Sequence, residues 1–186
     1  MPRLFTALEI PNPIAMQLSL LQTGLPGARW IVRENFHITL KFIGDVELPV
    51  AKEIAYAMER VKTQPFSIKV EGMEVFGNSK PHSLYAGISK SQALLDLHAE
   101  QDRICRQLGI PVETRKFTPH ITIARIRNCK TRDLAQYLSR VGGIQSQVFA
   151  IKHFKLLSSR DSIGGGPYVT EETYQLMEDQ AYAQAG

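Results

Sequence analysis

Two short segments, residues 37–40 and 120–123, carry almost the same sequence: His-Ile-Thr, followed by Leu in the first and by Ile in the second. Because side chains alternate across a β-strand, each segment would place its histidine and threonine on one face and its two aliphatic residues on the other. A single His-x-Thr is a weak signal, but two copies in matching apolar frames are a strong one. The fold therefore has to bury one face of two such strands and present their polar faces.

The polar faces carry groups suited to acid–base chemistry on a phosphate. Imidazole is the side chain that titrates nearest neutral pH, so His37 and His120 can act as acid and base if they face one another across a groove. The hydroxyls of Thr39 and Thr122 can donate hydrogen bonds to the oxygens of an anion between them. The competing interpretation is two ordinary β-strands that tolerate a histidine, and the repetition weakens it.

The order of elements repeats after each His-x-Thr strand. Each is followed by a helix, a long β-rich segment, a loop containing Gly or Pro, and another strand, although the two series share little sequence. A length of 186 residues suits one substantial core. The predicted fold is α+β: a single bilobal domain over residues 1–186, with two pseudo-symmetric antiparallel sheets, helices outside, a central groove and one motif in each lobe. The first lobe is expected to be complete near residue 88.

Periodicity and end signals define the other elements. The clearest end is that of the third helix, at Gly109 with Pro111 just beyond. Helices are predicted over residues 12–24, 49–63, 91–108 and 131–140. Further strands are predicted over residues 3–10, 29–32, 66–76, 83–88, 147–158 and 167–177.

Charge, cysteine content and hydropathy exclude several classes of protein. The formal charge of +4 and the pI near 9.1 permit an anionic ligand without requiring one. Cys105 and Cys129 form no CxxC, which argues against a disulfide framework or a structural zinc site. The chain opens on a strand-like segment rather than a signal peptide, and no window reaches the length of a membrane span. We expect a soluble, cytoplasmic protein with no membrane association, acting as a monomer.

The extended motifs are Phe-His-Ile-Thr-Leu-Lys-Phe-Ile-Gly at 36–44 and Phe-Thr-Pro-His-Ile-Thr-Ile-Ala-Arg at 117–125. They resemble the paired HxTx signatures of the 2H phosphoesterases, and more narrowly those of the RNA 2′,3′-cyclic phosphodiesterases, also called 2′-5′ RNA ligases. The resemblance implies a bilobal fold and an enzyme that opens an RNA-terminal 2′,3′-cyclic phosphate to a 2′-phosphate without a metal. The likeness covers almost the whole chain, including residues 3–5, 28–30, 84–87, 94–108 and 165–168.

The resemblance also implies roles for individual residues. His37 is similar to the family's proton donor to the departing 3′ oxygen, and His120 to the proton acceptor that activates water. Arg125 matches an arginine that contacts the phosphate. Some members also join RNA ends through a 2′-5′ bond without a nucleotide cofactor. In keeping with this, the chain has neither a GxxxxGK[ST] loop nor the lysine motif of an adenylating ligase, and no cofactor is expected.

Strand alternation does not settle whether two basic residues, Arg125 and Lys41, point into the groove. Arg125 has the parity of the aliphatic residues of its motif, so it reaches the phosphate only if the strand twists or ends there, or if its side chain reaches round the edge. Lys41 has the parity of His37 and could add positive charge to the groove. A solvated lysine at the end of a strand is an equal alternative for Lys41.

Other candidate sites are weaker. A zinc ion on the two motif histidines is a rival, but neither motif carries a nearby acidic or thiol ligand, and three protein ligands are usual. His82, His98 and His153 are expected in a loop, a helix and a different strand, as structural or solvated residues. The glycines at 164–166 favour a mobile turn over a phosphate cradle, because a strand rather than a helix follows them.

The sequence leaves three functions open. The leading one is hydrolysis of an RNA 2′,3′-cyclic phosphate, with reversible 2′-5′ ligation beside it. The second is a non-catalytic RNA-binding module that uses the same groove. The third is a phosphodiesterase for another cyclic or 2′-5′ nucleotide, because the motifs recognise the phosphate and not the base.

Overall fold

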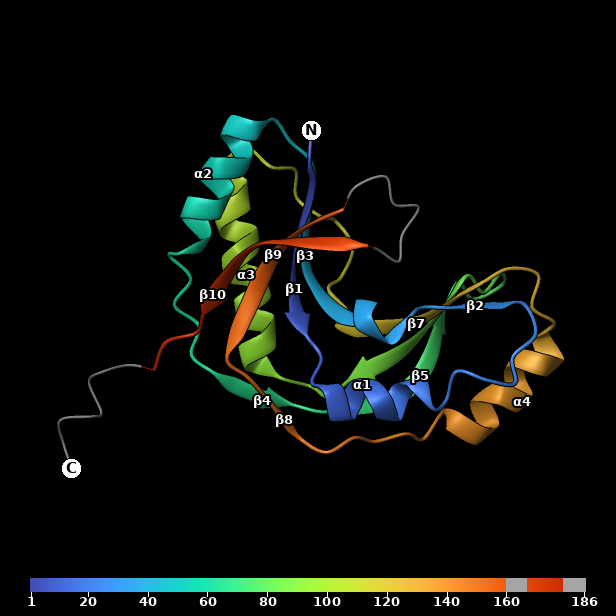
Figure 1. Cartoon of the computed structure of the whole chain (residues 1–186). Helices are drawn as coiled ribbons and strands as arrows, with labels where there is room; N and C mark the ends of the chain where they lie inside the picture. Colours follow the sequence, from blue (N-terminus) through green and yellow to red (C-terminus); the bar gives the residue numbers. More distant parts are fainter. Residues whose placement is uncertain (160–166, 179–186) are drawn as a thin grey trace, which may run out of the picture.

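The computed structural model describes residues 1–159 and 167–178 (Figure 1). None of the described helices combines the length and apolarity needed to span a membrane. The helices are α1 Asn12–Ser19, α2 Leu48–Met58, α3 Gln92–Gln107 and α4 Thr131–Val141, with a short 3-10 helix at Arg33–Asn35. The strands are β1 Arg3–Glu9, β2 Ala28–Trp30, β3 His37–Asp45, β4 Phe66–Ile68, β5 Val70–Phe76, β6 Ser83–Ile88, β7 His120–Ile126, β8 Phe149–Ile151, β9 His153–Ser159 and β10 Tyr168–Gln175.

Eight strands form one sheet in the order β10-β9-β1-β3-β7-β6-β5, with β2 also paired to β7. The two motif strands, β3 and β7, are neighbours at its centre, but they are paired only at Ile38 and Ile121. The sheet therefore consists of two half-sheets that meet at the motifs. We call β1, β3, β9 and β10 the first half-sheet, and β2, β5, β6 and β7 the second.

The two half-sheets are not the two halves of the sequence. The hairpin β5-β6 follows the first motif along the chain but pairs with β7 of the second motif. The hairpin β9-β10 follows the second motif but pairs with β1, and through it with β3. The prediction that the first lobe is complete near residue 88 is therefore wrong. The order of elements does repeat, but each repeat gives its hairpin to the other half-sheet.

Helices α2 and α3 lie beside the first half-sheet, and α4 lies beside the second (Figure 1). Helices α2 and α3 pack on one another beside the first half-sheet, where the Tyr174 hydroxyl of β10 donates to the Ala55 oxygen of α2 at 2.9 Å. Helix α4 packs against β5 of the second half-sheet, and its Tyr137 hydroxyl donates to the Leu21 oxygen just after α1 at 2.7 Å. This arrangement leaves the polar faces of the motif strands uncovered by helices.

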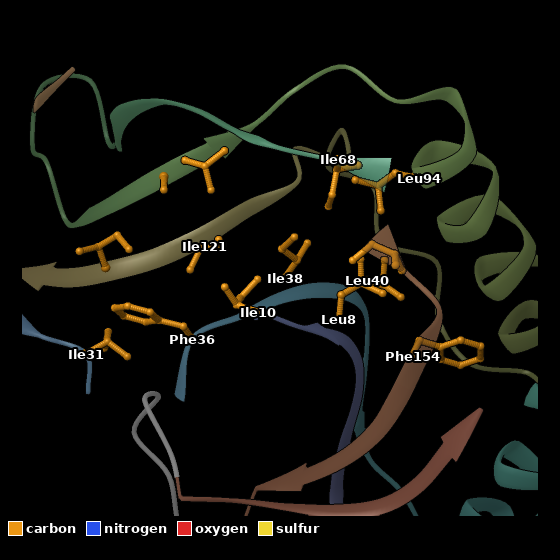
Figure 2. Close-up of a cluster of buried hydrophobic side chains, with 14 of the residues drawn as sticks. Leu8, Ile10, Ile31, Phe36, Ile38, Leu40, Ile68, Leu94, Ile121 and Phe154 are labelled. Atoms are coloured by element: carbon orange, nitrogen blue, oxygen red, sulfur yellow. The ribbon is translucent and has the colours of Figure 1, made fainter. Parts of the chain in front are cut away.

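The hydrophobic core runs beneath the junction of the motif strands. Ile38 and Ile121 are both fully buried there, and Figure 2 shows them side by side among other aliphatic side chains and Phe36. Burying an aliphatic side chain of this size stabilises a fold by about 1.5–3 kcal/mol. The apolar positions of the two motifs thus hold together the strands whose polar positions carry the chemistry.

Strand β3 contains a β-bulge directly after its motif threonine. Thr39 and Lys41 face consecutive residues of β1, so Leu40 is an extra residue on β3. A bulge of this kind reverses the alternation of side chains beyond it. Lys41 consequently turns to the buried face, where it is 2% exposed, and Phe42 turns to the polar face, where it is 64% exposed.

Strand β7 contains a bulge at the equivalent position. Thr122 and Ala124 face consecutive residues of β6, which makes Ile123 the extra residue. Ala124 is fully buried, and Arg125 is exposed on the face that carries His120. The parity objection to Arg125 is removed by this bulge, which local sequence did not reveal.

Candidate active site

A groove of about 600 Å³ lies over the junction of the two half-sheets. Its walls come from the motif strands, from β1, from the starts of β6 and β10, and from the segment that precedes β7. Two imidazoles and two threonine side chains therefore share one cavity. All the site residues predicted from the sequence line it: His37, Thr39, His120, Thr122 and Arg125.

Each motif histidine is held by the carbonyl group two residues before it. The Nδ1 atom of His37 is 2.8 Å from the oxygen of Asn35, and Nδ1 of His120 is 2.7 Å from the oxygen of Thr118. Because a carbonyl oxygen only accepts, Nδ1 carries the hydrogen in both rings, and Nε2 is the atom that can gain or lose a proton. Nε2 of His37 is also 3.0 Å from Oγ1 of Thr39. Both rings are thus fixed in the same tautomer.

Two aromatic rings flank each imidazole, and they come from other strands or from strand ends. Such rings shield the imidazoles from water on their apolar sides. Sequence reasoning missed them, because their place beside the histidines depends on pairings between distant strands. The ring-centre distances to His37 are 5.4 Å for Phe5 and 5.2 Å for Tyr168, and those to His120 are 4.9 Å for Phe76 and 5.3 Å for Tyr85.

Burial lowers the pKa of both motif histidines, because the imidazolium form loses hydration. The hydrogen bond to Asn35 opposes the shift in the pKa of His37, and the charge of His120 adds to it. The bond to Thr118 likewise opposes the shift in the pKa of His120, and the charge of Arg125 adds to it. Two charged imidazoles thus disfavour one another, so the groove favours a pair with one charged and one neutral ring over a doubly charged pair.

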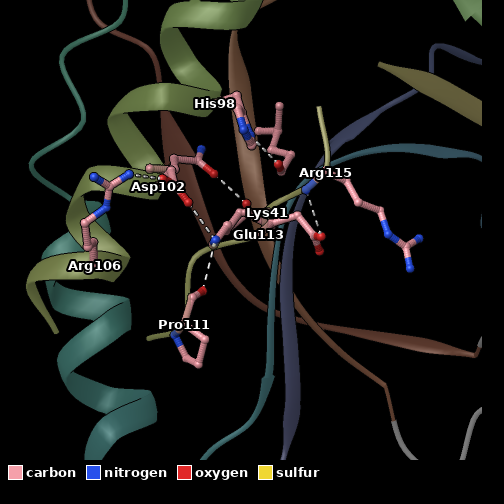
Figure 3. A network of polar contacts seen from close by, with 10 residues as sticks. Lys41, His98, Asp102, Arg106, Pro111, Glu113 and Arg115 are labelled. Carbon is pink, nitrogen blue, oxygen red and sulfur yellow. Dashed lines mark hydrogen bonds and ion pairs between the residues drawn. The ribbon is translucent and has the colours of Figure 1, made fainter. Parts of the chain in front are cut away.

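An ion pair neutralises Lys41. Its Nζ atom is 2.7 Å from Oδ1 of Asp102 on α3 and 3.5 Å from the oxygen of Pro111 (Figure 3). Asp102 also binds Arg106 at 2.7 Å. Both sequence interpretations of Lys41 are therefore wrong. The bulge turns its side chain to the buried face, and a buried ammonium group needs the carboxylate partner that it has here.

His98 of α3 links the two motif strands, although sequence reasoning assigned it only a structural or solvated role. Its Nδ1 atom is 2.7 Å from the oxygen of Leu40, the bulged residue of β3 (Figure 3). Its ring stacks on Phe117, with the ring centres 3.9 Å apart and the planes 9° from parallel. Phe117 directly precedes Thr118, whose oxygen holds His120. The helical position predicted for His98 is confirmed, and these contacts are structural.

The remaining candidates from the sequence are His82, His153 and the glycines at 164–166. His82 precedes β6 and lines the groove, whereas His153 begins β9 and binds Glu9 at 2.8 Å. Within residues 1–159 and 167–178, no group of three or more His, Cys, Asp or Glu side chains is placed to hold a metal ion. The glycines at 164–166, predicted to form a mobile turn, are outside the described residues.

Comparison with known proteins gives one family over nearly the whole chain. Residues 8–85 and 87–168 match the family described as LigT like Phosphoesterase. The chain is 31% identical over 144 residues to the RNA 2′,3′-cyclic phosphodiesterase of Aeropyrum pernix, covering 76% of this chain and 81% of that protein. It is 32% identical over 173 residues to the protein of the same name from Aquifex aeolicus, covering 90% of each.

Solved structures share the fold at lower identity. The protein TT0787 of Thermus thermophilus superposes with a TM-score of 0.80 and 21% identity, covering 94% of this chain and 97% of that one. E. coli LigT complexed with 3′-AMP superposes with a TM-score of 0.78 and 22% identity, covering 96% and 100%. The predicted α+β class, with an antiparallel sheet and helices outside it, is confirmed.

Proposed function

Because the chain belongs to the LigT-like phosphoesterase family and is therefore an enzyme, we propose that it hydrolyses the 2′,3′-cyclic phosphate at an RNA end to a 2′-phosphate. The observation that carries the proposal is the pair of imidazoles that share one groove and one tautomer, each beside a threonine. The relatives named RNA 2′,3′-cyclic phosphodiesterase support this choice of substrate. The alternative of a non-catalytic binding module is set aside.

In the proposed reaction, Nε2 of His120 takes a proton from water while the water oxygen attacks phosphorus. The bond between phosphorus and the 3′ oxygen breaks, and His37, protonated at Nε2, gives its proton to that oxygen. Proton exchange with solvent then restores both rings. The charge of Arg125 supports this assignment, because it favours the neutral, basic form of His120.

Hydrogen-bond donors stabilise the charge that develops on the non-bridging oxygens. Oγ1 of Thr39 lies 3.0 Å from Nε2 of His37, so its hydroxyl group is beside the acid and can donate its hydrogen to a non-bridging oxygen of the phosphate. Thr122 and Arg125 are the other hydrogen-bond donors to these oxygens. Acid, base and donors are all side chains, so the proposed reaction needs no metal. A 5′-hydroxyl that replaces water gives a 2′-5′ phosphodiester by the same steps, and the proposal includes this ligation.

Product analysis tests the proposal. The purified protein, treated with EDTA, is incubated with an oligoribonucleotide that ends in a 2′,3′-cyclic phosphate, and the 2′- and 3′-phosphate products are separated. We expect only the 2′-phosphate, because the 3′ oxygen leaves, and no effect of EDTA. A 3′-phosphate product would contradict the assigned direction of attack. Absence of any product from this RNA would remove the proposal in favour of another phosphodiester substrate.

The pH profile of kcat/KM should be bell-shaped, with its maximum on the acid side of neutrality. Protonation of His120 removes the base as pH falls, and deprotonation of His37 removes the acid as pH rises. Burial lowers both pKa values, so both limbs move below the ordinary imidazole value of about 6.5. Bound anionic phosphate stabilises the imidazolium, so the alkaline limb of kcat should lie at higher pH than that of kcat/KM. A kcat/KM optimum well above neutrality would contradict this expectation.

A further inference from the structure

We infer that the segment between α3 and β7, residues 110–119, binds a second phosphate of the substrate, the phosphodiester that precedes the cyclic phosphate. This inference rests on the proposed function and deepens it: the preferred substrate becomes the end of an RNA chain rather than a free cyclic nucleotide. Arg115 and Lys116 of this segment line the same groove as His37 and His120. They are the groups that would contact the second phosphate.

The cations of the groove divide into paired and unpaired ones. Lys41 and Arg3 are each held by a carboxylate, at 2.7 Å and 3.1 Å. Arg115 and Lys116 are exposed, and their side chains make no ion pair or hydrogen bond with any residue of the described ranges. Arg125 is exposed and unpaired by the same measure. The groove therefore presents three cationic groups whose charge the described protein does not neutralise.

A single phosphate does not neutralise all three cationic groups. A cyclic phosphodiester carries one negative charge, which Arg125 and the threonine hydroxyls can satisfy. Glu113 also lines the groove, but its Oε1 accepts from the backbone N–H of Arg115 at 3.4 Å and pairs with neither cation of the described segment (Figure 3). Neighbouring cations without a counter-charge repel one another. A second phosphate supplies the missing charge, and Arg and Lys are the usual contacts of nucleic-acid phosphates.

Residues 110–119 contain no helix or strand, yet they are held at both ends. Near the start, the Pro111 oxygen is 3.5 Å from Nζ of Lys41, and near the end, Phe117 stacks on His98. The two cations lie between these anchors. A segment that is fixed before binding loses less conformational entropy when the ligand binds.

The order along the chain separates the two cationic positions. The segment enters β7 at His120, whereas Arg125 follows five residues further along the strand. Because a strand rises about 3.3 Å per residue, these five residues put Arg125 roughly 15 Å along the strand from the point where the segment enters it. Two separate cationic positions in one groove fit two phosphates of one strand better than a single phosphate.

The test compares two substrates that differ by one nucleotide: adenosine 2′,3′-cyclic phosphate, and ApA that ends in a 2′,3′-cyclic phosphate. For the unaltered protein we expect kcat/KM to be about tenfold higher for ApA, the size of one good charge-assisted contact. The double variant Arg115→Ala, Lys116→Ala should lose this preference while its kcat/KM for the mononucleotide changes by less than about twofold. For ApA, the slope of log(kcat/KM) against log(salt concentration) should become shallower in the double variant by about 0.7, the value for one phosphate of a single strand.

The matched control is Lys90→Ala combined with Arg132→Ala. It removes the same two charges from exposed positions outside the groove and should keep the preference for ApA. Equal kcat/KM for the two substrates in the unaltered protein would overturn the inference. So would an equal loss on both substrates in the double variant, or an equal loss in the control.

Failure of the proposed function would be seen separately, as no hydrolysis of either substrate. In that case, the affinities of ApA 2′-phosphate and of adenosine 2′-phosphate, measured by calorimetry, show whether the second phosphate site exists. Tighter binding of the dinucleotide that disappears in the double variant would support the site. Equal binding of the two ligands would refute it.

Discussion

Replacing either motif histidine with asparagine should lower kcat by about 10²–10⁴-fold, because each variant removes one member of an acid–base pair. The side-chain N–H of asparagine can still reach the carbonyl that Nδ1 binds, at 2.8 Å from His37 and 2.7 Å from His120. What is lost is Nε2, the atom that exchanges a proton. The measurement is steady-state kcat for formation of the 2′-phosphate.

The two variants should also differ in their residual pH dependence. His37→Asn lacks the acid, so its rate should no longer fall as pH rises. His120→Asn lacks the base, so its rate should no longer fall as pH drops. His153→Asn is the matched control, since this histidine lies on β9 outside the groove, and it should keep normal kcat. Near-normal turnover in either motif variant, with thermal unfolding unchanged, would refute the paired-histidine mechanism.

Arg125→Gln should lower kcat/KM by about 10²–10³-fold, the cost of removing a donor to a developing oxyanion. The same substitution removes a positive charge that lowers the pKa of His120, so the acid limb of the kcat/KM profile should move to higher pH. Arg125→Lys keeps the charge but not the planar fork of donors. It should restore the acid limb and only part of the rate.

The matched control for this arginine is Arg127→Gln, two residues further along, exposed and outside the groove lining. It should change neither the rate nor the pH profile. If Arg125→Gln kept normal kcat/KM, the phosphate role of Arg125 would be wrong. If the rate fell but the acid limb stayed in place, the charge of Arg125 would not affect the pKa of His120.

The sequence predicted the parts of the molecule that depend on local patterns. The third helix ends where Gly109, with φ of +76°, stops it. Alternation within the motifs placed His37 and His120 opposite a buried aliphatic face, and the structure has Ile38 and Ile121 fully buried there. These features depend only on residues that are close in the sequence, so they can be predicted from the sequence alone.

The features that failed depend on pairing between distant strands. Strict alternation grouped Lys41 with His37 and argued against Arg125 as a phosphate contact, and a bulge in each strand reverses the alternation at both positions. A bulge is set by the register against the neighbouring strand, which the sequence of the bulged strand does not contain. The aromatic walls, such as Phe5 beside His37, depend on the same long-range register.

The exchange of hairpins has a consequence for synthesis on the ribosome. The strand β3 carries His37, but its half-sheet also needs β9 and β10, which span residues 153–175. A nascent chain that has exposed both motifs, through residue 126, still lacks those strands and cannot close the first wall of the groove. Non-local pairings of this kind form late, because the loop between the partners has to close first. The enzyme should therefore acquire activity in a single late step of its synthesis, rather than one half at a time.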